Sequence, residues 1–172
     1  MTAWVGVVCT LAATGGFGVL LARQQRRRPE DLAALQAALG ALRTEVEYGR
    51  TPLAEALVRT AAAGTPPVRA LFAGAAARLR AARGTTAAEA WRAALAEAEP
   101  RSAWSAEDIV PIRQLGDQLG RSDAADQVRH IESCVRRLRA AEVEARRGLE
   151  RRVRMWLYLG FLAGAGVILA AR

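Results

Sequence analysis

The chain has 172 residues, a formal net charge of +8 and an aromatic content of 5%, which is too low for a large β-sheet core. Its richness in Ala, Leu, Glu and Arg favours an all-α fold, and its length fits one modest domain together with membrane segments. The positive charge indicates an anionic partner, either nucleic acid or anionic lipid headgroups.

The first predicted element is an uncharged apolar segment at residues 3–22. Its 20 residues are about the length that crosses the hydrocarbon core of a bilayer. A cleaved secretory signal carries its positive charges before the apolar run. Here Arg23, Arg26, Arg27 and Arg28 follow it instead. We therefore expect residues 3–22 to be an uncleaved transmembrane helix.

A second uncharged segment, residues 155–171, is 17 residues long and near the lower limit for a span. Arg151, Arg152 and Arg154 stand just before it. Arginine-rich flanks face the cytoplasm under the positive-inside rule, and the flanks of both segments lie between the two spans. The expected protein is thus multi-pass, with residues 23–154 cytoplasmic and both termini outside.

Small residues recur at helical spacing in both segments, which suits close packing of helix backbones in a membrane. They are Gly6, Thr10, Thr14 and Gly18 in the first and Gly160 and Gly164 in the second. Three readings stay open: pairing of the two spans with each other, pairing with another protein, and the ordinary abundance of glycine in membrane helices.

Turn and capping residues divide residues 23–154 into about six helices with short links, which predicts antiparallel neighbours in a bundle. The first five helices are expected to run from Pro29 to Tyr48, from Thr51 to Gly64, from Thr65 to Gly84, from Thr86 to Pro100 and from Ser105 to Gly120. The sixth starts at Ser122 and continues without a break into the second membrane segment.

Apolar residues at spacings of three and four mark the inner faces of these helices. The predicted core includes Leu35, Leu42, Leu57, Leu71, Phe72, Leu115 and Ile131. Leu53 and Val58 are also placed inward on the second helix. Thr51 is expected to cap that helix, with Pro52 at its first position.

No catalytic, cofactor-binding or metal-binding pattern occurs in the sequence. His130 is the single histidine, and no second histidine or cysteine lies near it at a spacing that could complete a metal site. Cys9 and Cys134 read as small apolar side chains. The arginine run from Arg136 to Arg154 is interrupted by glutamates and lacks interleaved aromatic residues, so headgroup contact is favoured over nucleic acid. The sequence therefore predicts a non-enzymatic protein without cofactors.

The turn between the first two helices is a candidate partner-binding surface. It carries Glu47, Tyr48, Arg50 and Glu55 around a Gly-Arg-Thr-Pro turn that proline and glycine make rigid. Tyrosine and arginine are enriched at binding hot spots. The alternative is that Tyr48 merely covers the end of the bundle. The turn from Asp117 to Asp126 is the next candidate surface.

Several motifs, in order along almost the whole chain, resemble the stage III sporulation protein AB family. The most specific is Leu115-Gly116-Asp117-Gln118-Leu119-Gly120-Arg121-Ser122-Asp123, with Gln127 after it. The others are Arg28-Pro29 leading into the leucines of the first helix, Thr44 to Gly49, Thr51 to Leu57, Val68 to Phe72, Ala90-Trp91 and Tyr158-Leu159-Gly160.

This resemblance implies a relative of the inner-membrane platform protein of type II secretion and type IV pilus machines. The implied function is a place in the channel complex between mother cell and forespore, in the outer forespore membrane with the bundle in the mother-cell cytoplasm. The implied partner is a secretion-type ATPase encoded with it, and no small-molecule substrate is expected. Two alternatives remain open, a general secretion or pilus platform fragment outside sporulation and a membrane-tethered nucleic-acid binder.

Overall fold

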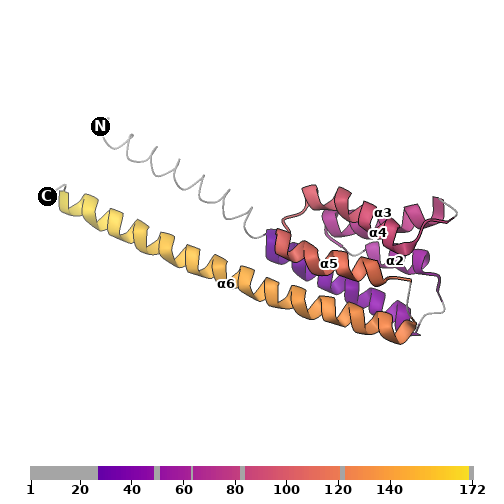
Figure 1. Ribbon diagram of the computed structural model, residues 1–172. Coiled ribbons are helices and arrows are strands. Elements are labelled where there is room, and N and C mark those ends of the chain that lie inside the picture. Colours follow the sequence, from indigo (N-terminus) through magenta and orange to yellow (C-terminus); the bar gives the residue numbers. More distant parts are fainter. Residues whose placement is uncertain (1–26, 49–50, 63, 82–83, 121–122, 171–172) are drawn as a thin grey trace.

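The computed structural model describes residues 27–48, 51–62, 64–81, 84–120 and 123–170, with side chains described as far as residue 149 (Figure 1). Residues 27–48 are helical. They are followed by α2 (Leu53–Ala61), α3 (Pro66–Ala81), α4 (Ala87–Ala98), the 3₁₀ turn η1 (Glu99–Arg101), α5 (Ala106–Gln118) and α6 (Ala124–Ala170). These ranges contain six α-helices and no strand, which confirms the all-α prediction.

Local capping chemistry starts three of the helices. Thr86 and Glu89 form a capping box at α4, and Ser105 and Asp108 form another at α5. At α6 the cap is Asp123, whose side chain accepts a hydrogen bond of 2.8 Å from the backbone N–H of Asp126. The predicted start at Ser122 lies outside the described residues.

The predicted cap of α2 is wrong. The helix begins at Leu53, so Pro52 occupies the cap position rather than the first helical position, and no side chain caps the helix. Thr51 lies one residue too early to reach the free N–H groups of the first turn. The fixed φ of proline still sets the direction in which α2 begins.

All seven predicted core residues are buried, with 3% or less of their surface exposed. Val58 is the exception on α2, since it is 40% exposed. The buried face of this helix consists of Ala56, Leu57, Thr60 and Ala61. Each residue turns a helix by about 100°, so Val58 follows Leu57 out of the core towards solvent.

Each helix from α2 to α6 packs on the next along the chain, and the helix 27–48 closes the bundle against α5 and α6. The helices 27–48 and α6 are antiparallel, because Gln36 bonds Glu142 while Arg43 pairs with Glu132. Pairs of α4 and α5, Ala87 with Gly120 and Trp91 with Gly116, also run in opposite directions. Figure 1 shows α6 extending well past the end of the bundle.

The two expected membrane segments have different positions relative to the described residues. Residues 3–22 lie outside them. In residues 155–171 the backbone of α6 is helical as far as Ala170, while the side chains lie outside the described part. Searching the described part of the chain finds no helix of sufficient length and apolarity to cross a membrane.

The motif from Leu115 to Gly120 is explained by the packing of α5 on α4. The side chain of Trp91 is fully buried, donates a 3.0 Å hydrogen bond from Nε1 to the carbonyl of Ile112, and lies edge-on to Phe72. A Cβ atom added to Gly116 would come within 2.1 Å of the Trp91 ring. Gly120 has a φ of +74°, so it ends the helix in the left-handed region.

We therefore expect Gly116→Ala to destabilise the protein by about 1–3 kcal/mol, the usual cost of overpacking a core. Gly40→Ala is the matched control, because a Cβ there meets nothing within 4 Å on an exposed helix position. Alanine is the better helix former, so the control should gain up to about 1 kcal/mol. Urea unfolding measures both free energies, and an unchanged stability of Gly116→Ala would contradict this account of the motif.

Candidate partner-binding surface

The end of the bundle where the helix 27–48 finishes carries the predicted surface. Tyr48 is 79% exposed, the most exposed large hydrophobic side chain among the described residues. Arg43 pairs with Glu132 near the beginning of α6, so this end is opposite to the one from which α6 leaves the bundle. The alternative that Tyr48 covers the bundle end does not fit so high an exposure. Arg50 and Gly49 lie outside the described residues.

Three carboxylates and one arginine surround Tyr48 in a set that we call the Tyr48 surface: Glu45, Glu47, Tyr48, Glu55 and Arg59. Arg59 of α2 lies 2.8 Å from Glu55 and 3.6 Å from Glu45, which joins α2 to the last turn of the helix 27–48. Glu47 pairs with Arg43 at 3.2 Å. These pairs are solvent-exposed and contribute little to stability. They position an acidic rim around an exposed aromatic ring.

The second candidate turn, from Asp117 to Asp126, has its carboxylates already engaged. Asp117 pairs with Arg92 of α4 at 2.9 Å, and Asp126 pairs with Arg129. Asp123 caps α6. This turn therefore holds α4, α5 and α6 in place, and it offers a partner fewer free groups than the Tyr48 surface.

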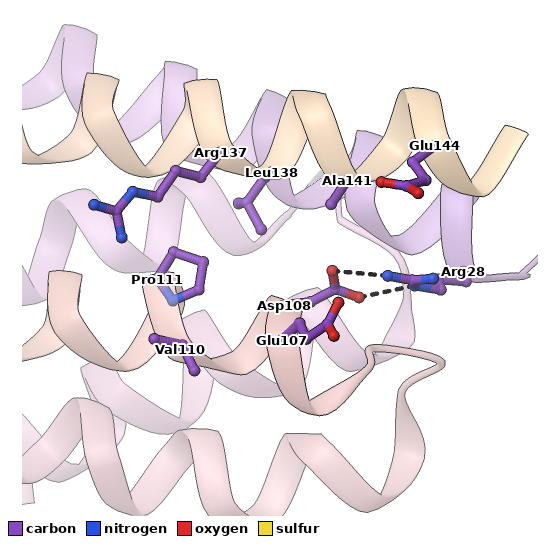
Figure 2. Close-up of a pocket in the computed structure, with 9 residues that line it drawn as sticks. All are labelled: Arg28, Glu107, Asp108, Val110, Pro111, Arg137, Leu138, Ala141 and Glu144. Carbon is purple, nitrogen blue, oxygen red and sulfur yellow. Dashed lines mark hydrogen bonds and ion pairs between the residues drawn. The ribbon is translucent and has the colours of Figure 1, made fainter. Parts of the chain in front are cut away.

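A polar cluster that the sequence did not reveal lies at the opposite end of the bundle (Figure 2). Arg28 donates from Nε to Asp108 Oδ2 at 2.9 Å and from Nη2 to Asp108 Oδ1 at 3.1 Å and to Ser105 Oγ at 3.0 Å. The Asp108 side chain is 1% exposed. Ser105 and Asp108 were expected only as the local start of α5, since a partner 80 residues away leaves no sequence signal.

The cluster keeps Asp108 ionised. Burial by itself would raise the pKa of Asp108, but the hydrogen bonds from Arg28 and Ser105 outweigh it and hold this pKa below its ordinary value. The bond to Asp108 likewise raises the pKa of Arg28. Asp31, also buried, accepts from the backbone N–H of Ala103 at 3.2 Å. Both contacts attach the beginning of the helix 27–48 to the beginning of α5.

A groove of about 270 Å³ between α5 and α6 has this ion pair at one end. Its walls include Glu107, Pro111, Arg137 and Glu144 (Figure 2). Pro111 lies beyond the first turn of α5, so the carbonyl of Glu107 lacks its helical donor. The groove has no nucleophile and base in contact, and within the described ranges no three His, Cys, Asp or Glu side chains could hold a metal ion.

The residues weighed for chemistry lie apart from one another. His130 is exposed on α6. Cys134 is buried, its Sγ lies 3.5 Å from the carbonyl of Pro111, and burial raises the pKa of its thiol to about 12. A thiol of such high pKa is a poor nucleophile, which agrees with a packing role. Cys9 and the small residues Gly6, Thr10, Thr14 and Gly18 lie outside the described residues, whereas Gly160 and Gly164 lie in the helical backbone of α6.

Comparison with known proteins agrees with the motifs and with the fold. The profile of the family described as stage III sporulation protein AB matches residues 3–170. Stage III sporulation protein AB of Bacillus subtilis (strain 168) is 31% identical over 166 residues, which cover 96% of each chain. A solved structure of a stage III sporulation protein AB superposes with a TM-score of 0.67 at 29% identity, covering 72% of this chain and 97% of that one. The chain belongs to the stage III sporulation protein AB family.

Proposed function

We propose that this protein is a non-enzymatic membrane component of a sporulation-specific, secretion-like channel complex, and that its bundle couples a cytosolic secretion-type ATPase to the membrane parts. Membership in a sporulation family supports the setting. The motifs shared with secretion platform proteins support the ATPase as partner. The proposed location is the outer forespore membrane, with the bundle in the mother-cell cytoplasm and residues 3–22 and 155–171 as spans.

The observation that carries the coupling proposal is the exposure of Tyr48. An aromatic ring that is 79% exposed gains much by burial in an interface, and aromatic residues dominate binding hot spots. It lies at the end of the bundle opposite to the extension of α6, so a cytosolic partner reaches it without approaching the bilayer. The acidic rim of Glu45, Glu47 and Glu55 fits a partner surface that bears basic residues.

The test of this contact is co-purification from sporulating cells. Tyr48→Ala combined with Arg50→Glu should keep the helical circular dichroism spectrum but lose the ATPase from the purified complex. A truncation at a hot spot costs about 2 kcal/mol or more, which is a loss of affinity of about thirtyfold. Val110→Ala is the matched control, since Val110 is 47% exposed on α5, and it should retain the ATPase. Full recovery with the folded Tyr48 variant would remove this surface from the proposal.

The proposed orientation has its own measurement. A reporter that is active outside the cytoplasm should be active when fused after Arg172 and inactive when fused near Gly84. A reporter that works only in the cytoplasm should show the reverse. This follows from the arginines that flank both apolar segments on their inner sides. The opposite pattern of activities would refute the orientation, whatever the ATPase result.

A further inference from the structure

The antiparallel contact between the helix 27–48 and α6 defines which positions of the two helices lie at the same level. Gln36 donates from Nε2 to Glu142 Oε2 at 2.8 Å. Arg43, two turns further along the first helix, lies 3.2 Å from Glu132. Towards the other end of the helix 27–48, Arg28 and Glu144 line the same groove (Figure 2). The interface thus continues up to the point where the described part of the first helix begins.

One face of α6 continues this interface beyond the bundle (Figure 1). Ala145 and Leu149 follow Glu142 on nearly the same side of the helix and are partly buried. Gly160 follows Glu142 by 18 residues, which is five full turns at 3.6 residues per turn, so it lies on the same face. Gly164 lies one turn further. An α-helical backbone connects all of these positions.

The chain supplies its own occupant for this face. Only residues 23–26 separate the apolar segment 3–22 from the described start of the helix 27–48, and four residues span at most about 14 Å. The segment therefore leaves the bundle beside α6. Gly18 precedes Gln36 by 18 residues, just as Gly160 follows Glu142 by 18. Helical continuation of the Gln36–Glu142 register brings Gly18 level with Gly160, and Thr14 level with Gly164.

We infer that residues 3–22 pack in antiparallel register against the α6 face of the same chain, with Gly18 opposite Gly160 and Thr14 opposite Gly164. The inference rests on the proposal that both segments span the membrane. Small residues at these four positions let the two backbones approach closely, which is the main source of helix association in lipid. The short connection raises the local concentration of the segment far above that of any second copy. A fixed hairpin of this kind transmits movement of the bundle into the bilayer as one body.

Cysteine cross-linking in membranes from cells that produce the full chain tests the register. In a Cys9→Ala background that keeps the buried Cys134, the pairs Gly18→Cys with Gly160→Cys and Thr14→Cys with Gly164→Cys should form a disulfide within one chain. Leu162 replaces Gly160 in the control pair, because it lies at similar depth on the opposite side of α6. That adds about 5 Å across the helix and exceeds disulfide reach.

The products separate the possible outcomes. Disulfide formation at monomer mass in both register pairs, and not in the Leu162→Cys control, supports the inference. Equal cross-linking of the control, dimers formed between chains with single cysteines, or no product from either register pair overturns it. The experiment needs no ATPase, so loss of the proposed partner contact leaves its result unchanged. A failed membrane orientation is detected separately by the reporter fusions.

Discussion

Replacing Leu35 and Leu115 together with alanine is expected to unfold the bundle. Both side chains belong to one core, with Leu35 fully buried on the helix 27–48 and Leu115 3% exposed on α5. Each change removes apolar contacts and leaves a cavity, at a cost of about 2–5 kcal/mol. The whole domain has about 5–15 kcal/mol of stability, so the two losses together remove most or all of it.

Thermal melting followed by circular dichroism measures this effect. Val58→Ala with Val110→Ala is the matched control, because these two side chains are 40% and 47% exposed. Surface changes of this kind usually alter stability by about 0.5 kcal/mol or less each. A Leu35→Ala, Leu115→Ala protein that melts at the same temperature as the control would mean that the inner faces of these helices are misassigned.

Arg28→Met is expected to cost about 3 kcal/mol, the lower end of the range for breaking a buried ion pair. The Asp108 side chain is 1% exposed, so the change leaves an uncompensated carboxylate in the interior. The lower end applies because the Arg28 side chain is itself 33% exposed. Arg27→Met, at an exposed neighbouring position, is the control and should be near neutral.

The pH dependence of this loss follows from the lowered pKa of Asp108. A carboxylate whose folded pKa lies below its unfolded value contributes stability above the unfolded pKa, and this contribution disappears as the pH falls through the folded pKa. The unfolded pKa of aspartate is about 3.9. The stability difference between the wild type and Arg28→Met should therefore be largest at neutral pH and should shrink below about pH 4. A difference that stays constant down to pH 2 would exclude the ion pair as its cause.

The sequence by itself determined those features that depend on residues one helical turn apart. Thr86 with Glu89 and Ser105 with Asp108 start helices because each pair bonds its own first turn. Gly84 and Gly120 have positive φ angles that glycine adopts without strain, so they end helices wherever the chain then goes. Leucines at spacings of three and four give an apolar face on any helix, which is why the seven core residues were predicted correctly.

The candidate surface was predictable in position but not in character. The turn chemistry places Tyr48 and Glu55 near each other along the chain, and this follows from sequence. Whether Tyr48 covers the bundle or projects from it depends on the neighbours that α2 and α6 bring to that end. The exposure of 79% is thus a property of the packed molecule. The outward position of Val58 has a similar origin, because a helix of 9 residues buries only the face that its neighbours cover.

Tertiary structure alone decided which distant residues meet. Arg28 and Asp108 are 80 residues apart, and nothing near Asp108 in the sequence distinguishes it from an ordinary capping residue. Gly116 looks like a flexible point within α5, yet it is the position at which the Trp91 ring needs space. Such pairs form only after the helices have docked, when burial makes a missing partner or an added methyl group costly. Local bonds form in any conformation that contains the helix, so sequence predicts them, whereas the docked contacts depend on the whole bundle.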